Sequence, residues 1–190
     1  RNGSVPVRSG IYKDFDIPLF NEEVIREALN NAIAHRAYGI QGEIVVKQYP
    51  TKIIFVNPGG FPHGVTVDNI LYVQSTPRNR LLADVLSKTG LVERSGQGVD
   101  NIYLDTISEG KPAPDYSKTD AFCVTLILSS KIEDAAFSQY INSIQDSLPD
   151  DAKLTVYDVL TLNMIRQSKN RQALDKRIVA NLLRSGYIEQ

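Results

Sequence analysis

Two polar side chains four residues apart, Glu27 and Asn31, are the first feature of the sequence that could do chemistry. Residues at positions i and i+4 of a helix leave it on the same side, one turn apart. A carboxylate can orient and deprotonate a water molecule, and a carboxamide oxygen can hold a hard cation such as Mg²⁺. An exposed polar pair on an amphipathic helix would give the same spacing, so the pair alone does not decide between these interpretations.

The helix that must position this pair is predicted over residues 22–36. Asn21 is a suitable N-cap, and the two glutamates that follow it favour the positive end of the helix dipole. The apolar residues recur at the three-and-four spacing of a helix with one buried face, at Val24, Ile25, Leu29, Ala32 and Ile33.

Two glycine-containing turns lie further along the chain, at residues 57–60 (Asn-Pro-Gly-Gly) and 95–98 (Ser-Gly-Gln-Gly). Glycine permits positive φ and close approach of a ligand to the backbone, and backbone N–H groups at a helix start can bind an anion. A hairpin exit and a plain helix entry turn remain the simpler explanations. The sequence has no Gly-x-x-x-x-Gly-Lys-Ser/Thr pattern, so a P-loop motor is not supported.

The order of these segments resembles the GHKL ATPases, which include gyrase, MutL, the heat-shock chaperone and the histidine kinases. The resemblance is closest to the divergent GHKL-type domain of proteins described as RecG-related or as transcriptional regulators. It covers roughly residues 10–130. The matching positions are Arg26-Glu27-Ala28, Asn31-Ala32, His35-Arg36, Asn57-Pro58-Gly59-Gly60 and Arg78-Asn79.

This resemblance implies a site for ATP and Mg²⁺, with Glu27 as general base and Asn31 as Mg²⁺ ligand. The turn of Asn57, Gly59 and Gly60 would hold the base, and the phosphates would contact Arg78, Gly96 and Gly98. In the GHKL pattern an aspartate at the position of Asn57 accepts a hydrogen bond from the adenine amino group. Here the residue is a neutral asparagine, and the glycine spacing is compressed relative to the usual Asp-x-Gly-x-Gly.

Composition is that of an ordinary globular protein. The chain has 190 residues, 42% of them hydrophobic and 23% charged, with a net charge of −1. It is long enough for one sizeable core, or for one core plus a small appendage. No apolar run approaches the ~20 residues of a membrane helix, and no membrane partner is expected. A single cysteine, Cys123, excludes an intrachain disulfide and favours a reducing, cytoplasmic location. The only methionine is Met164, so we expect a fragment of a longer protein.

The predicted fold is α+β, a two-layer GHKL/histidine-kinase-type ATPase sandwich over residues 1–130. Strands are expected across Val7 to Tyr12, at 42–49 and 52–57 as an antiparallel hairpin, and at 121–128. A short helix is predicted over residues 67–72, with Thr66 as its N-cap. Another helix should present an apolar face of Leu81, Leu82, Val85 and Leu86 before Gly90 ends it.

Residues 131–190 are predicted to form a small helical module. Three helical stripes, followed by a turn towards a strand, resemble a winged helix-turn-helix that lacks its wing. Its basic residues could contact duplex DNA, although a solvated helix face or a dimerisation module explains them equally well. They are Arg166, Lys169, Arg171, Lys176, Arg177 and Arg184.

The sequence therefore favours an ATP-binding regulatory domain of a transcriptional regulator, one that could also hydrolyse ATP and that is expected to form a homodimer. The alternative is a degenerate, non-catalytic GHKL-fold scaffold for dimerisation and interdomain coupling. His35 is expected to be a packing or hydrogen-bonding histidine inside the first helix.

Overall fold

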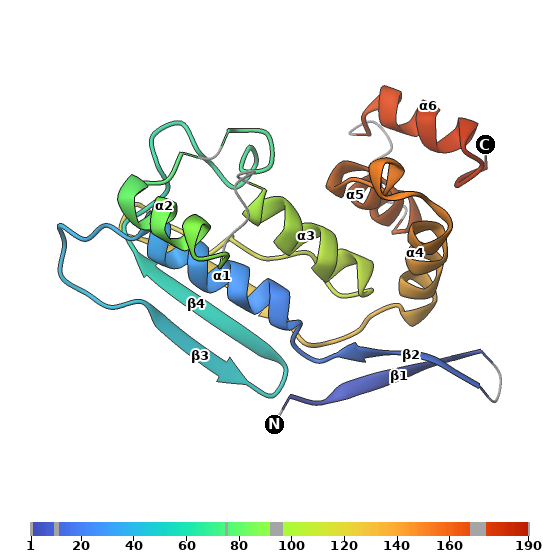
Figure 1. The fold of residues 1–190 in the computed structure, drawn as a ribbon, viewed down its shortest axis with the longest axis horizontal. Coiled ribbons are helices and arrows are strands. Elements are labelled where there is room, and N and C mark those ends of the chain that lie inside the picture. Colours follow the sequence, from blue (N-terminus) through green and yellow to red (C-terminus); the bar gives the residue numbers. More distant parts are fainter. Residues whose placement is uncertain (1, 10–11, 75, 92–96, 168–173, 190) are drawn as a thin grey trace.

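The computed structural model describes residues 2–9, 12–74, 76–91, 97–167 and 174–189. It shows a mixed α+β fold (Figure 1). The elements follow in the order β1 (Ser4–Ser9), β2 (Tyr12–Pro18), α1 (Glu22–His35), β3 (Val45–Tyr49), β4 (Lys52–Pro58), α2 (Arg80–Lys88), α3 (Gly98–Ser108), β5 (Cys123–Ser129), α4 (Ala135–Ser147), a 3₁₀ turn (Asp150–Ala152), α5 (Val156–Arg166) and α6 (Lys176–Arg184).

Strand β4 is the centre of a three-stranded antiparallel sheet of order β3-β4-β5. The predicted hairpin of β3 and β4 is confirmed, although β3 begins at Val45 rather than at residue 42. Side chains alternate along β4, so Ile53, Phe55 and Asn57 all face inward. Asn57 is thereby buried by the same alternation that builds the core.

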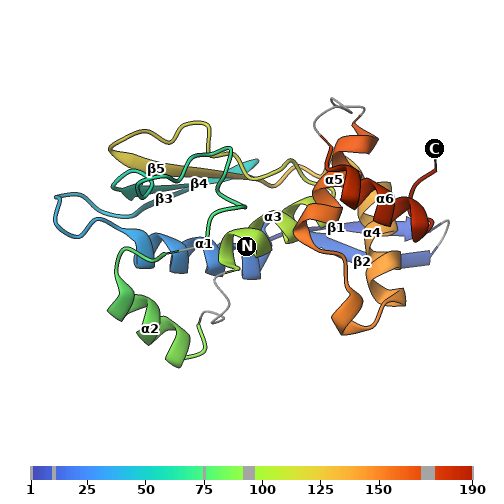
Figure 2. The same cartoon turned by 90° about the horizontal axis from the view of Figure 1, so that it is seen from above.

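Helices α1 and α3 form the second layer on one face of this sheet (Figure 2). Ile102 and Ile107 of α3 and Ala28 of α1 are almost completely buried between the layers. The predicted N-cap is confirmed, because the side chain of Asn21 accepts hydrogen bonds from two backbone N–H groups of the first turn. Asn21 also donates to Glu109 Oε1 at 2.7 Å, which ties the start of α1 to the end of α3.

The N-terminal segment differs from its prediction. Instead of one strand across Val7 to Tyr12, β1 and β2 form an antiparallel hairpin with an irregularity after Val7. Lys111 holds this hairpin against the domain. Its Nζ donates to Pro18 O at 2.7 Å and pairs with Glu109 Oε2 at 2.6 Å, and its side chain is only 3% exposed.

The prediction of a helix over residues 67–72 is wrong, because these residues form turns. The side chain of Asn69 explains the difference. It accepts from Thr66 N at 2.7 Å and donates to Gly64 O at 2.9 Å, and these local bonds compete with helical ones.

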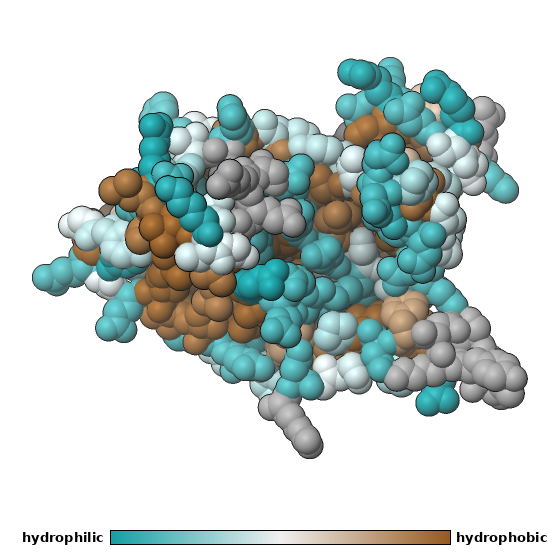
Figure 3. Space-filling view, in the orientation of Figure 1, coloured by the Kyte–Doolittle hydropathy of each residue, from teal (hydrophilic) through white to brown (hydrophobic). Residues whose placement is uncertain are grey.

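Helix α2 forms where it was predicted and ends before Gly90, but its apolar face does not enter the core. Leu81 is 83% exposed and Val85 is 56% exposed, and no residue of α2 is buried. Figure 3 shows hydrophobic side chains gathered over α2 and the adjoining part of α1. The apolar periodicity therefore predicted the helix correctly but did not predict that its apolar face is exposed.

The C-terminal helical unit (α4, α5 and α6) contains the three predicted helices. Thr155 and Asp158 form a capping box that starts α5. Arg166, counted among the basic residues for DNA, instead pairs with Asp134 at 2.6 Å and lies over the ring of Phe137. Lys169 and Arg171 lie outside the described residues.

The strand expected after α6 is absent from the described residues, where 185–188 form a turn and a bend. Within the same described ranges, no helix is long and apolar enough to cross a membrane.

Candidate functional site

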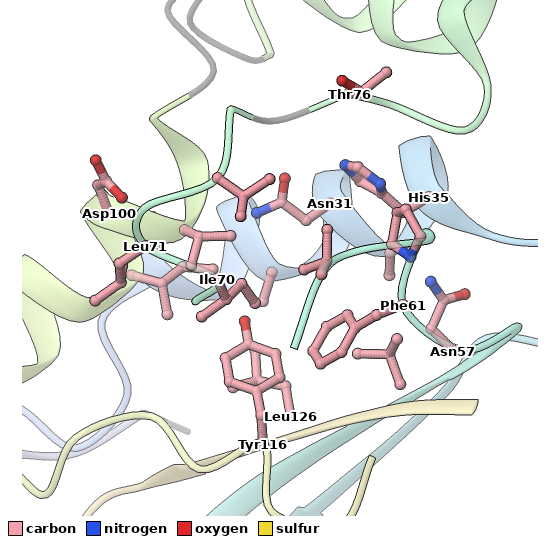
Figure 4. Close-up of a pocket in the computed structure, with 18 of the residues that line it drawn as sticks. Asn31, His35, Asn57, Phe61, Ile70, Leu71, Thr76, Asp100, Tyr116 and Leu126 are labelled. Atoms are coloured by element: carbon pink, nitrogen blue, oxygen red, sulfur yellow. The ribbon is translucent and has the colours of Figure 1, made fainter. Parts of the chain in front are cut away.

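A cavity of ≈610 Å³ lies between the α1–α3 layer and the sheet (Figure 4). Residues 61–74, called the roof segment below, cover it without forming a helix or a strand. The walls are more apolar than polar and carry several polar side chains, a combination found in small-molecule sites. Apart from Tyr72 and Tyr116, the polar side chains that line it are Asn31, His35, Asn57, His63, Gln74, Thr76, Gln97 and Asp100.

Asn57 brings an unpaired acceptor to this cavity. The residue is 5% exposed, and its Oδ1 is buried without a hydrogen-bond partner in the protein. Leaving a buried polar atom unpaired costs about 1–3 kcal/mol. A ligand group that donates to Oδ1 would remove that cost.

Asn31 contributes the second unpaired polar atom of the cavity, its buried Nδ2. Its carboxamide has an oxygen and a nitrogen at nearly equivalent positions, so a half-turn presents either an acceptor or a donor. In the view of Figure 4, Asn31 lies between Asp100 at one end of the cavity and His35 at the other. The two asparagines therefore offer separate polar contacts to one ligand.

Gly98 allows the start of α3 to pack against Glu27 and Asn31, the polar pair predicted on α1. A Cβ at Gly98 would overlap Glu27 Oε1 and would lie 2.9 Å from Asn31 Nδ2 and 3.0 Å from its Oδ1. Only glycine allows this approach without moving those side chains. Glu27 itself does not line the cavity, and Gly96 lies outside the described residues.

Arg78 lies on the glycine turn rather than in the cavity. Its Nη2 donates to Gly60 O at 2.8 Å, and its Nη1 occupies the space that a Cβ at Gly59 would need. Gly59 has φ of +96°, a conformation that side chains with a Cβ rarely adopt. A phosphate contact by Arg78 would require it to leave Gly60 O.

The glycine turn is also packed against the segment before β5. Gly59 N donates to Phe122 O at 2.7 Å, and a Cβ at Gly60 would lie 2.7 Å from Asp120 O. Packing against backbone thus explains glycine at position 60, and a positive φ together with the Arg78 and Ala37 side chains explains it at position 59. The presence of the two glycines alone does not demonstrate a ligand.

His35, predicted to be a packing or hydrogen-bonding residue, lines the cavity one turn beyond Asn31. Burial lowers its pKa, and the nearby charge of Arg78 lowers that pKa further. A neutral imidazole offers one donor and one acceptor. The signal in the sequence was the continued four-residue spacing through Glu27, Asn31 and His35.

Asn79 and Asp100 were not assigned roles from the sequence. Asn79 Nδ2 donates to Ala34 O at 3.0 Å and to Arg36 O at 2.7 Å, so it caps the end of α1 and fixes the position of Arg78. Asp100 lines the cavity from the first turn of α3, and burial raises the pKa of its carboxyl. The sequence offered one signal for Asn79, because Arg78-Asn79 is among the positions that match the GHKL-type domain.

A metal held by the protein alone has little support within the described ranges, which contain no group of three His, Cys, Asp or Glu side chains suited to it. Mg²⁺ in nucleotide sites is commonly held by one or two protein ligands together with substrate phosphates. The single amide of Asn31 fits that arrangement better than a closed metal site.

Comparison with known proteins bears on this cavity. Residues 41–126 match the family model described as "Putative ATP-dependent DNA helicase recG C-terminal". The match supports a GHKL-like, ATPase-related domain. The matched range runs from before β3 to within β5, so it contains Asn57, Gly59, Gly60, Arg78 and Gly98 but excludes Glu27 and Asn31.

Among solved structures, the crystal structure of the DIP2311 protein from Corynebacterium diphtheriae is similar, with 26% sequence identity and a TM-score of 0.74. The similarity covers 88% of this chain, including more than the ATPase-related domain, but only 33% of that protein. This chain thus spans about a third of the length of that relative. No curated protein matches the sequence.

Proposed function

We propose that this chain binds an adenine nucleotide together with Mg²⁺ in the cavity between α1 and the sheet. The observation that carries the proposal is that Asn57 Oδ1 and Asn31 Nδ2 are both buried, both without a partner, and both in residues that line this cavity. Buried polar atoms almost always have a hydrogen-bond partner. A nucleotide would supply partners to both.

The base would lie at the Asn57 end. The exocyclic amino group of adenine would donate to Asn57 Oδ1, and the N–H of the same carboxamide can donate to a ring nitrogen. Asparagine makes this pair of bonds to adenine in protein–DNA complexes. The apolar walls there, including Phe61 and Leu126, suit the faces of a purine.

The phosphates would lie towards the start of α3. Backbone N–H groups at a helix N-terminus favour an anion, and Gly98 places that end beside Glu27 and Asn31. The oxygen of Asn31 would hold Mg²⁺, which would neutralise part of the phosphate charge. The described residues that line the cavity include no lysine or arginine, so binding should depend strongly on the cation.

Hydrolysis is the further step of this proposal. Glu27 does not line the cavity, but its Oε1 lies beside Gly98 at the start of α3, and this proximity supports a role in which its carboxylate accepts a proton from an attacking water. A positioned general base contributes about 10²–10⁴-fold to a rate. Glu27 would then act on water, whereas Asn31 would act on binding.

The biological role we infer is regulatory, as part of a transcriptional regulator whose C-terminal helical unit contacts duplex DNA. Helix α6 presents Lys176, Arg177 and Arg184 to solvent, and these cations support the inference. Phosphate contacts by such cations give salt-dependent binding.

A second candidate is a non-catalytic scaffold that dimerises. The exposed apolar side chains of α2, Leu81 and Val85 above all, favour it because large exposed apolar patches often mark protein interfaces. Analytical ultracentrifugation of wild type and Leu81→Asp tests this candidate. A dimer that the substitution dissociates would support the scaffold, and a monomeric wild type would count against it.

Thermal denaturation with nucleotides tests the binding proposal. A ligand that binds only the folded state raises the melting temperature with its concentration. We expect ATP and ADP to stabilise the protein in the presence of Mg²⁺, and to do so much less when EDTA removes the cation. Equal stabilisation by GTP would contradict an adenine site.

A further inference from the structure

The roof segment of the cavity has little structure of its own. Its backbone hydrogen bonds are local turn bonds, such as Tyr72 N to Asn69 O at 2.8 Å and Val65 N to Pro62 O at 3.0 Å. Segments with few long-range bonds open readily. Contacts from elsewhere must therefore decide how firmly the roof segment stays over the cavity.

One such contact comes from the C-terminal helical unit. The hydroxyl of Tyr157, in the first turn of α5, donates to Leu71 O at 2.5 Å. Its ring also stacks on that of Tyr72, with centroids 5.5 Å apart and an interplanar angle of 22°. Both Leu71 and Tyr72 line the cavity.

Tyr157 is itself held in place. The capping box of Thr155 and Asp158 fixes the start of α5, and the adjacent Val156 is buried in the core. The pKa of the Tyr157 hydroxyl is raised, first by burial, then by the charge of Asp100 and then by Tyr72. Asp100 lines the cavity from α3, so it lies close to Tyr157. Tyr157 thus lies where the roof segment, the start of α3 and the C-terminal helical unit meet.

We propose that Tyr157 is a positioning residue for the ligand of this cavity, through which the C-terminal helical unit holds the roof segment closed. The inference rests on the proposed nucleotide site and adds a residue that lies outside the ATPase-related domain. Coupling between two binding sites is reciprocal. A partner that binds α5 or α6 and shifts Tyr157 would therefore change the affinity for nucleotide, and nucleotide would change the affinity for that partner by the same factor.

The test uses Tyr157→Phe, which keeps the ring and removes only the donor. Tyr140→Phe is the matched control, because Tyr140 makes an equivalent bond to Tyr187 O at 2.5 Å within the C-terminal helical unit. Hydrogen exchange of the ligand-free proteins and calorimetric titration with Mg-ADP are measured for all three chains.

We expect amides of residues 64–73 to exchange about fivefold faster in Tyr157→Phe, the effect of one lost hydrogen bond, and the dissociation constant for Mg-ADP to rise by a similar factor. Tyr140→Phe should change neither quantity. Unchanged exchange in residues 64–73, or unchanged affinity, in Tyr157→Phe would overturn the inference.

The two proposals fail in different measurements. A wild-type protein that binds no Mg-ADP overturns the nucleotide site whatever the variants do. Hydrogen exchange needs no ligand and reads the contact between α5 and the roof segment directly.

Discussion

Gly98 at the start of α3 lies directly against Glu27 of α1, so closely that a Cβ on the glycine would overlap the carboxylate oxygen. The two residues are 71 positions apart in the sequence. The resemblance assigned both to one site, but no local pattern in the sequence predicted their contact. The contact brings a helix N-terminus, a carboxylate and a carboxamide to one place.

Gly98→Ala should therefore damage the site more than the fold. The added methyl would meet the ends of the Glu27 and Asn31 side chains, which can move, rather than backbone, which cannot. We expect a loss of stability below ~1 kcal/mol but a loss of ~10–10²-fold in hydrolysis, because catalytic groups tolerate little misplacement. Gly39→Ala is the control, since nothing lies within 4 Å of its added Cβ. Equal activity in the two variants would show that Gly98 does not shape the site.

Glu27→Ala and Asn31→Ala should differ in kind. Removing the proposed base should leave Mg-ATP affinity nearly intact and lower turnover by ~10²–10⁴-fold. Removing the proposed Mg²⁺ ligand should weaken Mg-ATP binding itself, because the triphosphate loses part of its bridge to the protein. Calorimetry and steady-state phosphate release distinguish the two. Loss of affinity in Glu27→Ala alone would reverse the assigned roles.

Asn57→Asp should sharpen the choice of base. A carboxylate accepts more strongly than a carboxamide and cannot donate, so it favours the amino group of adenine over the carbonyl oxygen of guanine. We expect the ratio of ATP to GTP affinity to rise in competition binding. A ratio that falls or stays constant would place the base away from Asn57.

Much of the fold followed from sequence patterns. The first helix and its Asn21 cap, the hairpin of β3 and β4, and the three C-terminal helices were predicted because local periodicity and capping determine them. The turns at residues 66–72 were missed because Asn69 bonds to nearby backbone in a way that periodicity does not register. The exposure of Leu81 was missed because amphipathicity does not say what covers a face.

The site was predicted less completely. Spacing along one helix placed Asn31, and the end of a strand placed Asn57, and both line the cavity. The roof segment and Tyr157 could not be predicted, because their contact joins residues 86 positions apart by a hydrogen bond to backbone. Arg78 was expected at phosphate and instead donates to Gly60 O.

Asp105 should make stability depend on pH in a defined direction. Burial, reinforced by the charge of Glu109, raises the pKa of its carboxyl from 3.8 to about 6. Between these two pKa values the folded state binds a proton that the unfolded chain releases. The free energy of unfolding therefore falls as the pH rises from 3.8 through about 6. Asp105→Asn should raise the free energy of unfolding by roughly 1–3 kcal/mol at pH 8 and change it little near pH 4.

Urea denaturation at the two pH values measures this effect. Asp84→Asn, on the exposed surface of α2, is the control and should behave like wild type at both. An Asp105→Asn variant no more stable than wild type at pH 8 would contradict the assignment.

DNA binding by the C-terminal helical unit should be weak, independent of sequence and steeply dependent on salt. Each phosphate contact contributes about −0.9 to the slope of log K against log salt. Lys176→Ala with Arg177→Ala should reduce that slope by up to ~2 in fluorescence anisotropy, whereas Lys47→Ala with Lys118→Ala should not. Absence of binding at low ionic strength would favour a protein partner for this unit.

Isothermal titration of the wild-type chain with Mg-ATP tests the central claim most directly. Two unpaired buried amide atoms in one largely apolar cavity predict saturable binding at one site per chain, weakened when Mg²⁺ is removed. No detectable heat at millimolar Mg-ATP, with no competition by ATP against Mg-ADP, would contradict the nucleotide site and leave the scaffold as the better account.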